Sequence, residues 1–239
     1  MRILEGKGVT KHFGGLAAIS NVDFYVDQGE IVGLIGPNGA GKTTLFNLIS
    51  AALPLNSGVI RFKGEKITGL KPHRICRAGV ARTFQSVKVF GNMPVLGNVL
   101  LGSLFGTSIG MSSADATKEA IESLEFVGLS AVSATLAKDL TLANQKRLEV
   151  AKALATQPEL LLLDELVAGL NATETAQAME LVTKIRDRGI TILVIEHVMK
   201  AIMSICDRIM VLHHGEKIAE GTPKEITNNQ TVIEVYLGK

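Results

Sequence analysis

The densest group of residues that could do chemistry lies at positions 36–43. This segment reads Gly-Pro-Asn-Gly-Ala-Gly-Lys-Thr and matches the phosphate-binding pattern G-x-x-x-x-G-K-[ST]. Glycines let backbone N–H groups turn inward around phosphate oxygens, because no side chain obstructs them. Lys42 would add positive charge toward the outer phosphates, and the Thr43 hydroxyl could ligate Mg²⁺. The predicted nucleotide-binding residues here are Gly36, Pro37, Asn38, Gly39, Ala40, Gly41, Lys42, Thr43 and Thr44.

Two adjacent carboxylates follow a run of leucines at positions 160–163. A buried strand there would present Asp164 and Glu165 at its C-terminal end, where ligands bind in open α/β sheets. We expect Asp164 to hold Mg²⁺ through water, and Glu165 to orient and deprotonate the water that attacks the γ-phosphate. Acidic residues also end strands simply because they are solvated. The phosphate-binding pattern in the same chain favours the catalytic interpretation.

Apolar spacing predicts the elements that would position these residues. Residues 30–35 read as a buried strand, and residues 42–52 carry apolar side chains at helical spacing. The glycine loop would therefore join a strand to a helix, whose N-terminal dipole favours an anion. Short strands joined by turns are expected within 3–29 and 57–70. The last third of the chain alternates expected strands with expected helices, which implies parallel β-α-β units. The strands are 160–163, 190–195 and 208–213, and the helices are 173–188, 197–206 and 231–237.

The middle of the chain, residues 87–156, has a different composition. Long β-branched runs disappear, Ala, Leu, Ser and Glu dominate, and residues 118–127 and 145–156 show helical spacing. We interpret 87–156 as an inserted helical subdomain. The nucleotide-binding α/β core and a β subdomain would occupy 1–86 and 157–239.

Composition excludes several classes of protein. The chain has 239 residues, of which 46% are hydrophobic and 20% charged, so it can form a core and is not disordered. A formal net charge of +2 is too small to indicate nucleic-acid binding or a polybasic membrane anchor. No apolar run approaches the ~20 residues of a spanning helix. Charged residues at positions 2, 5 and 7 argue against a signal peptide, and the widely separated Cys76 and Cys206 fit a reducing cytosol.

The two motifs at this separation resemble those of ABC-type ATP-binding subunits, and the resemblance covers essentially the whole chain. It implies an α/β fold with a P-loop NTPase (RecA-like) core, an N-terminal antiparallel β subdomain and an inserted helical subdomain, together forming a single ABC ATPase domain over 1–239. It also implies that the chain binds ATP and Mg²⁺ and hydrolyses ATP.

Three further residues match family positions. Gln85, in Arg-Thr-Phe-Gln, would contact Mg²⁺ and sense the γ-phosphate, although alone it would be an ordinary surface residue. His197 would hydrogen-bond the γ-phosphate, which an imidazole can do in either charge state. The other four histidines are interpreted as solvated or locally paired. Phe13 would stack on adenine, and a buried core phenylalanine is the alternative.

One segment departs from the family. The usual Leu-Ser-Gly-Gly-Gln signature aligns with Leu-Thr-Leu-Ala-Asn at positions 140–144. In the family this loop caps the ATP of a partner subunit in a head-to-tail dimer. Thr141 keeps the hydroxyl, but Ala143 adds a methyl where glycine would allow close backbone approach. We expect dimer closure to be retained but weakened.

The two ends of the chain resemble the branched-chain amino acid importer branch, in residues 11–16, 221–226 and 232–238. The implied function is an ATPase subunit that powers a membrane importer of branched-chain or related amino acids by ATP-driven dimer closure. Its implied partners are transmembrane permease subunits, a second identical or related ATPase subunit and, indirectly, a periplasmic or extracellular solute-binding protein, with no nucleic acid. It would lie in the cytoplasm, on the inner face of the cell membrane.

Apolar residues after Gln85 would line a groove that receives a helix of the membrane subunit, or would belong to a core. They are Val87, Val89, Phe90, Met93, Val95 and Leu96, and we expect one or two exposed contacts among them. The alternative functions are a lipopolysaccharide-export-type ABC ATPase and a regulatory module that binds ATP but hydrolyses it poorly because of the altered signature. A soluble ABC ATPase acting on DNA or ribosomes would usually carry basic arms or a second cassette, which this sequence lacks.

Overall fold

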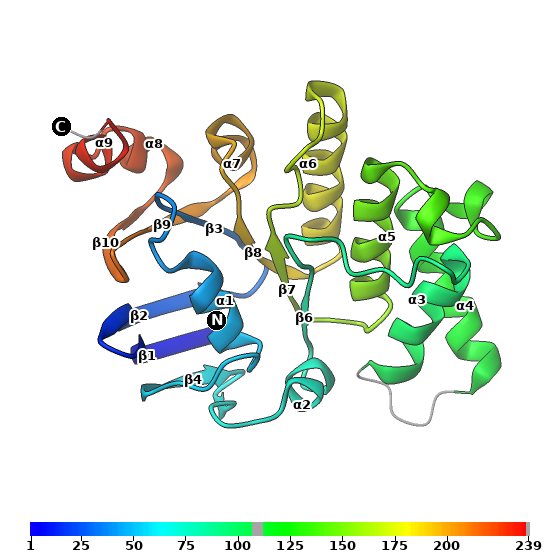
Figure 1. Ribbon diagram of the computed structural model, residues 1–239, viewed down its shortest axis with the longest axis horizontal. Helices are drawn as coiled ribbons and strands as arrows, with labels where there is room; N and C mark the ends of the chain where they lie inside the picture. Colours follow the sequence, from blue (N-terminus) through cyan, green and yellow to red (C-terminus); the bar gives the residue numbers. More distant parts are fainter. Residues whose placement is uncertain (107–111, 238–239) are drawn as a thin grey trace.

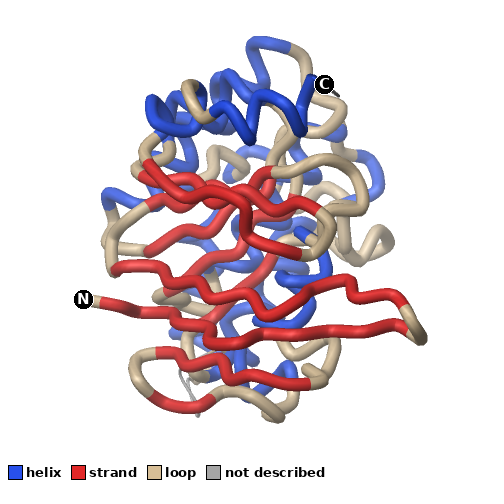
Figure 2. Tube along the Cα trace, turned by 90° about the vertical axis from the view of Figure 1, so that its left-hand side faces the viewer, coloured by secondary structure: helices blue, strands red, loops and turns tan. Residues whose placement is uncertain are grey.

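The computed structural model describes residues 1–106 and 112–237, which form two β-sheets with helices packed around them (Figure 1). The smaller sheet is antiparallel, with the strand order β2-β1-β4-β5. Its strands are β1 (Arg2–Phe13), β2 (Leu16–Asp27), β4 (Ser57–Phe62) and β5 (Glu65–Lys66). Figure 2, turned by 90°, shows the long β1–β2 hairpin alongside the strands of the larger sheet.

The larger sheet has the strand order β10-β9-β3-β8-β7-β6. Its strands are β3 (Ile31–Ile35), β6 (Val80–Arg82), β7 (Leu160–Asp164), β8 (Thr191–Ile195), β9 (Arg208–His213) and β10 (Glu216–Gly221). All neighbouring strands are parallel except β10, which pairs antiparallel with β9 at one edge. The predicted α/β fold is confirmed.

The helices cover the larger sheet, and α3, α4 and α5 gather at the end of the molecule remote from β1 and β2 (Figure 1). The helices are α1 (Lys42–Ile49), α2 (Pro72–Arg77), α3 (Val95–Phe105), α4 (Ser113–Phe126), α5 (Leu142–Leu154), α6 (Ala172–Asp187), α7 (Met199–Ile205), α8 (Pro223–Thr227) and α9 (Gln230–Leu237). The division of the chain at 87 and 156 remains a prediction. Within those bounds the described residues form helices and one isolated bridge, between Pro94 and Leu136.

The larger sheet is buried on both faces, which explains its apolar strands. Every residue of β3, β7 and β8 is buried. Along β3 the side chains alternate between two hydrophobic clusters, with Ile31 in one and Val32 in the other. The first cluster includes residues of α3, α4 and α5, and the second includes residues of β1, β2, β4 and α1. The sheet is thus held between two cores, and its strand ends are fixed in space.

Three local predictions were wrong. Residues 3–29 form parts of two 12-residue strands, not several short ones. The helix expected at 42–52 ends at Ile49. The helix expected at 197–206 begins only at Met199, so His197 lies in the loop that follows β8. This last difference matters for the site, because it puts His197 at a strand end.

No helix in residues 1–106 and 112–237 combines the length and the apolar character that crossing a bilayer requires. Both cysteines are free thiols, with Cys206 buried and Cys76 partly exposed. Gly238, in the tail segment that resembles the importer branch, lies outside the described residues.

Candidate nucleotide site

The glycine loop lies between β3 and α1, as expected, and its glycines have a steric reason. Gly36 has φ +152°, and a Cβ there would lie 2.1 Å from the carbonyl oxygen of Leu212. Gly41 has φ +103°, and its Cβ would lie 2.4 Å from the carbonyl oxygen of Ala18. Only glycine fits these two positions without moving the backbone. The loop therefore leads directly into the N-terminus of α1, which favours an anion.

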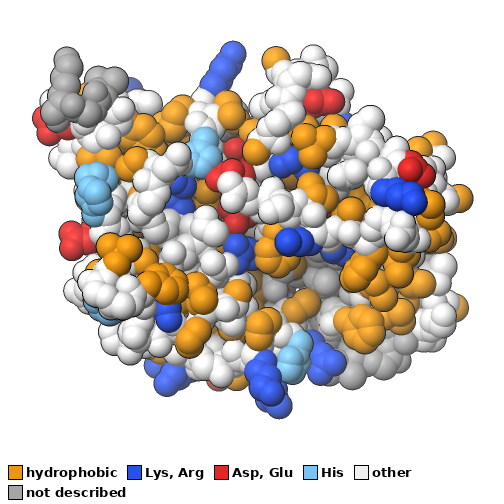
Figure 3. Space-filling model, in the orientation of Figure 1, with side chains coloured by type: hydrophobic (Ala, Val, Ile, Leu, Met, Phe, Trp, Pro, Cys, Tyr) orange, Lys and Arg blue, Asp and Glu red, His pale blue; other side chains and the backbone are white. Residues whose placement is uncertain are grey.

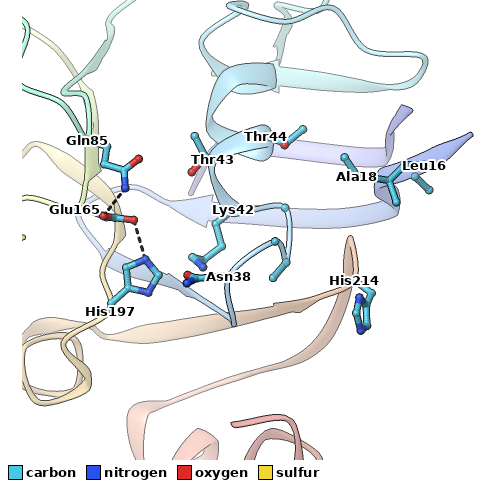
Figure 4. Close-up of a pocket in the computed structure, with 14 residues that line it drawn as sticks. Leu16, Ala18, Asn38, Lys42, Thr43, Thr44, Gln85, Glu165, His197 and His214 are labelled. Carbon is cyan, nitrogen blue, oxygen red and sulfur yellow. Dashed lines mark hydrogen bonds and ion pairs between the residues drawn. The ribbon is translucent and has the colours of Figure 1, made fainter. Parts of the chain in front are cut away.

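Lys42, the first residue of α1, is only 6% exposed. Its Nζ donates hydrogen bonds to the carbonyl oxygens of Gly36, at 2.7 Å, and Pro37, at 3.0 Å. Burial lowers the pKa of Lys42, while the carboxylates of Glu165 and Asp164 act in the opposite direction. The ammonium group is thus held inside the loop, at the wall of a pocket of about 330 Å³ (Figure 4).

Glu165 lies on the same pocket and receives two polar side chains. Gln85 Nε2 donates to Glu165 Oε2 at 2.8 Å, and His197 Nε2 lies 2.7 Å from Glu165 Oε1. Figure 4 shows both side chains pointing at this carboxylate, across the pocket from Lys42. The three residues follow β6, β7 and β8, which are neighbours in the parallel sheet. Their convergence follows from the topology, because parallel strands end at the same edge.

The backbone of Glu165 is in the left-handed region, with φ +51°. A glutamate rarely adopts this conformation, and such outliers concentrate at functional sites. In this conformation the side chain lines the pocket (Figure 4). Glu165 is 9% exposed, so its carboxylate is shielded but accessible from the pocket.

Asp164 does not line the pocket but lies behind it, 2% exposed. Its Oδ2 accepts a hydrogen bond from Arg82 at 2.8 Å, and its Oδ1 is buried with no partner among the described residues. Burial raises the pKa of Asp164, and Arg82 opposes that shift. This orphaned carboxylate oxygen, the Thr43 hydroxyl and the Gln85 amide oxygen are oxygen donors of the kind that Mg²⁺ prefers. The residues therefore fit the predicted ion.

Arg82 is a site residue that the sequence interpretation missed. It ends β6, and besides Asp164 it contacts Asn47 Oδ1 at 2.6 Å and Ser50 Oγ at 3.1 Å, both on the α1 side. The sequence signal was a lone arginine three residues before Gln85. Because β6 has only three residues, periodicity could not show that this arginine is held against the neighbouring strand.

The other end of the pocket is lined by Leu16, Ala17, Ala18 and His214 (Figure 4). Phe13, expected to stack on adenine, is not among the lining residues. It is 48% exposed and lies opposite Leu16 in the β1–β2 hairpin, with the Lys11 ammonium 5.3 Å from its ring. Its stacking role therefore remains a prediction. His214 was interpreted as a solvated or locally paired histidine, and the structure adds that it borders the pocket.

The altered signature lies away from the pocket of its own chain. Thr141 caps α5, and its Oγ1 accepts a hydrogen bond from the Asn144 N–H at 3.3 Å. Neither Thr141 nor Ala143 lines the nucleotide pocket. Thr141 and Leu142 are exposed at the first turn of α5. The signature loop therefore does not contribute to the nucleotide pocket of its own chain.

Known proteins resemble the chain along its whole length. The family model described as ABC transporter matches residues 19–168, and the model described as Branched-chain amino acid ATP-binding cassette transporter matches residues 216–239. The high-affinity branched-chain amino acid transport ATP-binding protein BraF of Pseudomonas aeruginosa is 42% identical over 250 residues, covering 99% of this chain and 98% of BraF. LivG of Escherichia coli K12, which carries the same description, is 41% identical with the same coverage.

Solved structures agree with this family. A nucleotide-free ATP-binding cassette from an ABC transporter superimposes with a TM-score of 0.90 at 30% identity, covering 100% of both chains. The ADP conformation of an ATP-binding cassette of an ABC transporter gives the same values. A dimeric post-hydrolysis cassette bound to ADP and Pi has a TM-score of 0.83 at 26% identity, covering 92% of this chain and 98% of that one. A full-length match in sequence and in fold leaves one conclusion: the chain belongs to the ABC transporter family of ATP-binding cassettes, in its branched-chain amino acid branch.

Proposed function

We propose that this chain is the ATP-hydrolysing subunit of a membrane importer for branched-chain or related amino acids. The observation that carries the proposal is the carboxylate of Glu165, held across one pocket from the buried ammonium of Lys42. This arrangement suits the attack of water on a terminal phosphate. The amino acid class is taken from relatives such as BraF and LivG, whose names describe branched-chain amino acid transport.

Each residue of the pocket has a proposed part in hydrolysis. The amides of 36–43 and Lys42 would hold the phosphates, and Glu165 would accept the proton of the attacking water. Gln85 and His197 would exchange their present bonds to Glu165 for contacts with the terminal phosphate. This exchange would free the carboxylate for the water.

Magnesium would be held by the Thr43 hydroxyl, the Gln85 amide oxygen and, through water, the free Oδ1 of Asp164. When bound, the ion neutralises charge on the phosphate oxygens. Arg82 would favour the charged form of Asp164 and leave its second oxygen available, because it occupies only Oδ2.

A second ATPase subunit would complete the site. Thr141 and Ala143, at the exposed start of α5, would cap the nucleotide of the partner, as the resemblance implies. The methyl group of Ala143 would weaken closure without removing the α5 dipole. The pairing of two chains would then be the step that ATP drives.

Permease subunits would dock on a second cavity, of about 340 Å³, lined by residues of α2, β6, α3 and α5. Phe84 and Phe90 line it and are 42% and 54% exposed. Figure 3 shows hydrophobic side chains gathered over α3 and α5 on this face. Six apolar residues that follow Gln85 in the sequence were candidates for contact with the membrane subunit. Of these, Phe90 is the exposed contact that we propose, whereas Val95 is fully buried. Docking would place the chain on the cytoplasmic face of the membrane, with a solute-binding protein acting on the far side.

The alternatives have less support. A lipopolysaccharide exporter is disfavoured because the C-terminal segment 216–239 matches the branched-chain amino acid model and full-length relatives share that description. A regulatory module that barely hydrolyses ATP is motivated by Ala143. Against it stands the complete polar set around Glu165.

Co-purification from native membranes, followed by phosphate-release assays, tests the proposal. We expect integral permease subunits and an amino-acid-binding protein to accompany the chain, and ATP hydrolysis to rise when the binding protein presents leucine or a related solute. Co-purification of an envelope-lipid export complex, or the absence of hydrolysis in both the pure chain and the reconstituted complex, would overturn it.

A further inference from the structure

A buried lysine lies directly behind the pocket. Lys146, on the second turn of α5, is 5% exposed, and its Nζ donates a hydrogen bond of 2.8 Å to the backbone carbonyl oxygen of Glu165. A lysine ammonium is rarely buried unless it is paired, because removing the charge from water is costly. None of the motifs that define the nucleotide pocket includes this residue.

The backbone on both sides of Glu165 is fixed by further hydrogen bonds. The N–H of Glu165 donates to the carbonyl oxygen of Ile195 at 2.9 Å. The N–H of Val167 donates to Oε1 of Glu196, a buried carboxylate, at 2.7 Å. The carbonyl oxygen of Glu165, the residue whose φ is +51°, accepts two hydrogen bonds: the shorter, of 2.8 Å, comes from the Lys146 side chain, and the longer, of 3.3 Å, comes from the N–H of Ala168. A left-handed glutamate persists only where its surroundings hold it.

Nearby carboxylates favour the charged form of this lysine, against the effect of burial. Burial lowers the pKa of Lys146, and the carboxylates of Glu196, Glu149 and Glu165 oppose this shift, in that order. Glu149 and Glu196 are each 3% exposed. Glu149 lies one turn after Lys146 on α5, and its Oε1 accepts a hydrogen bond of 3.1 Å from the N–H of Lys88. Lys88 follows Gln85 by three residues in the sequence. The ammonium therefore feels the charge of two anchored carboxylates and donates its hydrogen bond to one carbonyl.

We propose that Lys146 is a positioning residue for hydrolysis: by holding the peptide carbonyl of Glu165, it keeps the carboxylate of that residue aimed into the nucleotide pocket. The inference rests on the proposed ATPase function, because it assigns to Lys146 an effect on the catalytic step. It differs from a purely structural role, in which Lys146 would only satisfy buried charge. The two roles predict different kinetics.

Lys146→Met is the main test, because methionine has a similar length and tolerates burial. We expect kcat for ATP hydrolysis to fall at least about tenfold, while the Kd for ATP stays within about twofold, since the phosphate-binding loop is untouched. Lys146→Arg, which keeps a buried donor and its charge, should recover at least about a third of the wild-type kcat. An unchanged kcat in the methionine variant, or a loss of ATP affinity that matches the loss of kcat, would overturn the proposal.

A double-mutant cycle separates positioning from general damage. If Lys146 acts through the Glu165 carboxylate, adding Lys146→Met to Glu165→Gln should lower the residual single-turnover rate by less than about twofold. An equal fold loss in both backgrounds would contradict the proposal. Lys184→Met serves as the control, since Lys184 lies on the exposed face of α6 with its side chain 57% accessible. Thermal unfolding of each variant checks that it is folded.

A second variant provides the test if the methionine variant does not fold. Lys146→Gln retains an amide donor on a shorter side chain, and we expect the same direction of change in kcat with unchanged ATP binding. Normal kcat in a folded Lys146→Gln variant, whose reach is too short for the same bond, would overturn the proposal. Failure of the proposed function looks different, because the wild-type chain and its complex would then show no hydrolysis at all.

Discussion

The two ends of the nucleotide pocket are constructed differently. At the phosphate end, Lys42 and Glu165 are nearly buried, and each makes at least two hydrogen bonds with groups from other loops or strand ends. At the opposite end, Leu16 is 70% exposed and lies on a hairpin, beside two alanines and one histidine. Charged groups that act on a phosphate must be positioned to fractions of an ångström, whereas the flat ring of a nucleotide base needs only a surface on which to pack.

The largest effect is expected at Glu165. Glu165→Gln keeps the shape of the side chain but removes the base, so ATP hydrolysis should fall about 10²- to 10⁴-fold. Binding should survive, measured as an undiminished ATP-dependent rise in Tm. Glu180→Gln, on the exposed face of α6, is the matched control and should hydrolyse normally. Unchanged turnover in Glu165→Gln would remove the base from this position.

Lys42 should have the next largest effect, on binding. Lys42→Ala removes a charge-assisted contact with phosphate worth about 1.5–3 kcal/mol, which lowers ATP affinity about 10- to 100-fold. The ATP-dependent rise in Tm should vanish at concentrations that stabilise the wild type. Lys118→Ala, on the exposed surface of α4, should retain it. Normal ATP affinity in Lys42→Ala would mean that phosphate binds elsewhere.

A smaller effect is expected at the base end. Phe13→Ala should weaken ATP binding about fivefold, because an aromatic contact is worth about 1 kcal/mol, and should leave kcat at saturation nearly unchanged. Binding of inorganic tripolyphosphate should not change. Phe105→Ala, at another exposed phenylalanine far from the pocket, should match the wild type. If Phe13→Ala binds ATP normally, Leu16 and its neighbours form the base surface without it.

The smallest effect is expected for the difference in affinity between ATP and GTP. Among the described residues that line the base end, the side chains are apolar except for that of His214. Few groups can therefore distinguish the edge of adenine from that of guanine. The Kd values for ATP and GTP should therefore agree within about threefold, measured by competition. A difference above about tenfold would show that directed polar groups read the base.

The site is most predictable from the sequence where one motif follows one strand. The loop at 36–43 and the acidic pair at the end of β7 were predicted because their residue types are rare in combination and their strands are apolar on both faces. The small sheet was harder, because register shifts between β1 and β2 break the alternation that marks a strand. Two long strands then read as several short ones.

Residues defined by distant contacts could not be predicted. Arg82 and Lys146 matter because of the residues that they contact. The partner of Arg82 lies 82 residues further along the chain, and the partner of Lys146 lies 19 residues further. No local pattern records such a pairing. His197 shows a milder case: its type and place after β8 were predicted, but its partner, Glu165, was not. The contact is visible only once three strand ends lie side by side.

The position of Lys146 on α5 has a consequence for two chains together. If they pair head to tail as proposed, residues 141–144 of one chain would contact the nucleotide in the neighbouring pocket, while Lys146, about one turn later on the same helix, holds the backbone carbonyl of Glu165 in its own chain. A movement of α5 by a fraction of its pitch would then let ATP bound at one site alter the position of Glu165 at the other site. The two sites of such a pair would then hydrolyse ATP in a coupled manner and not independently.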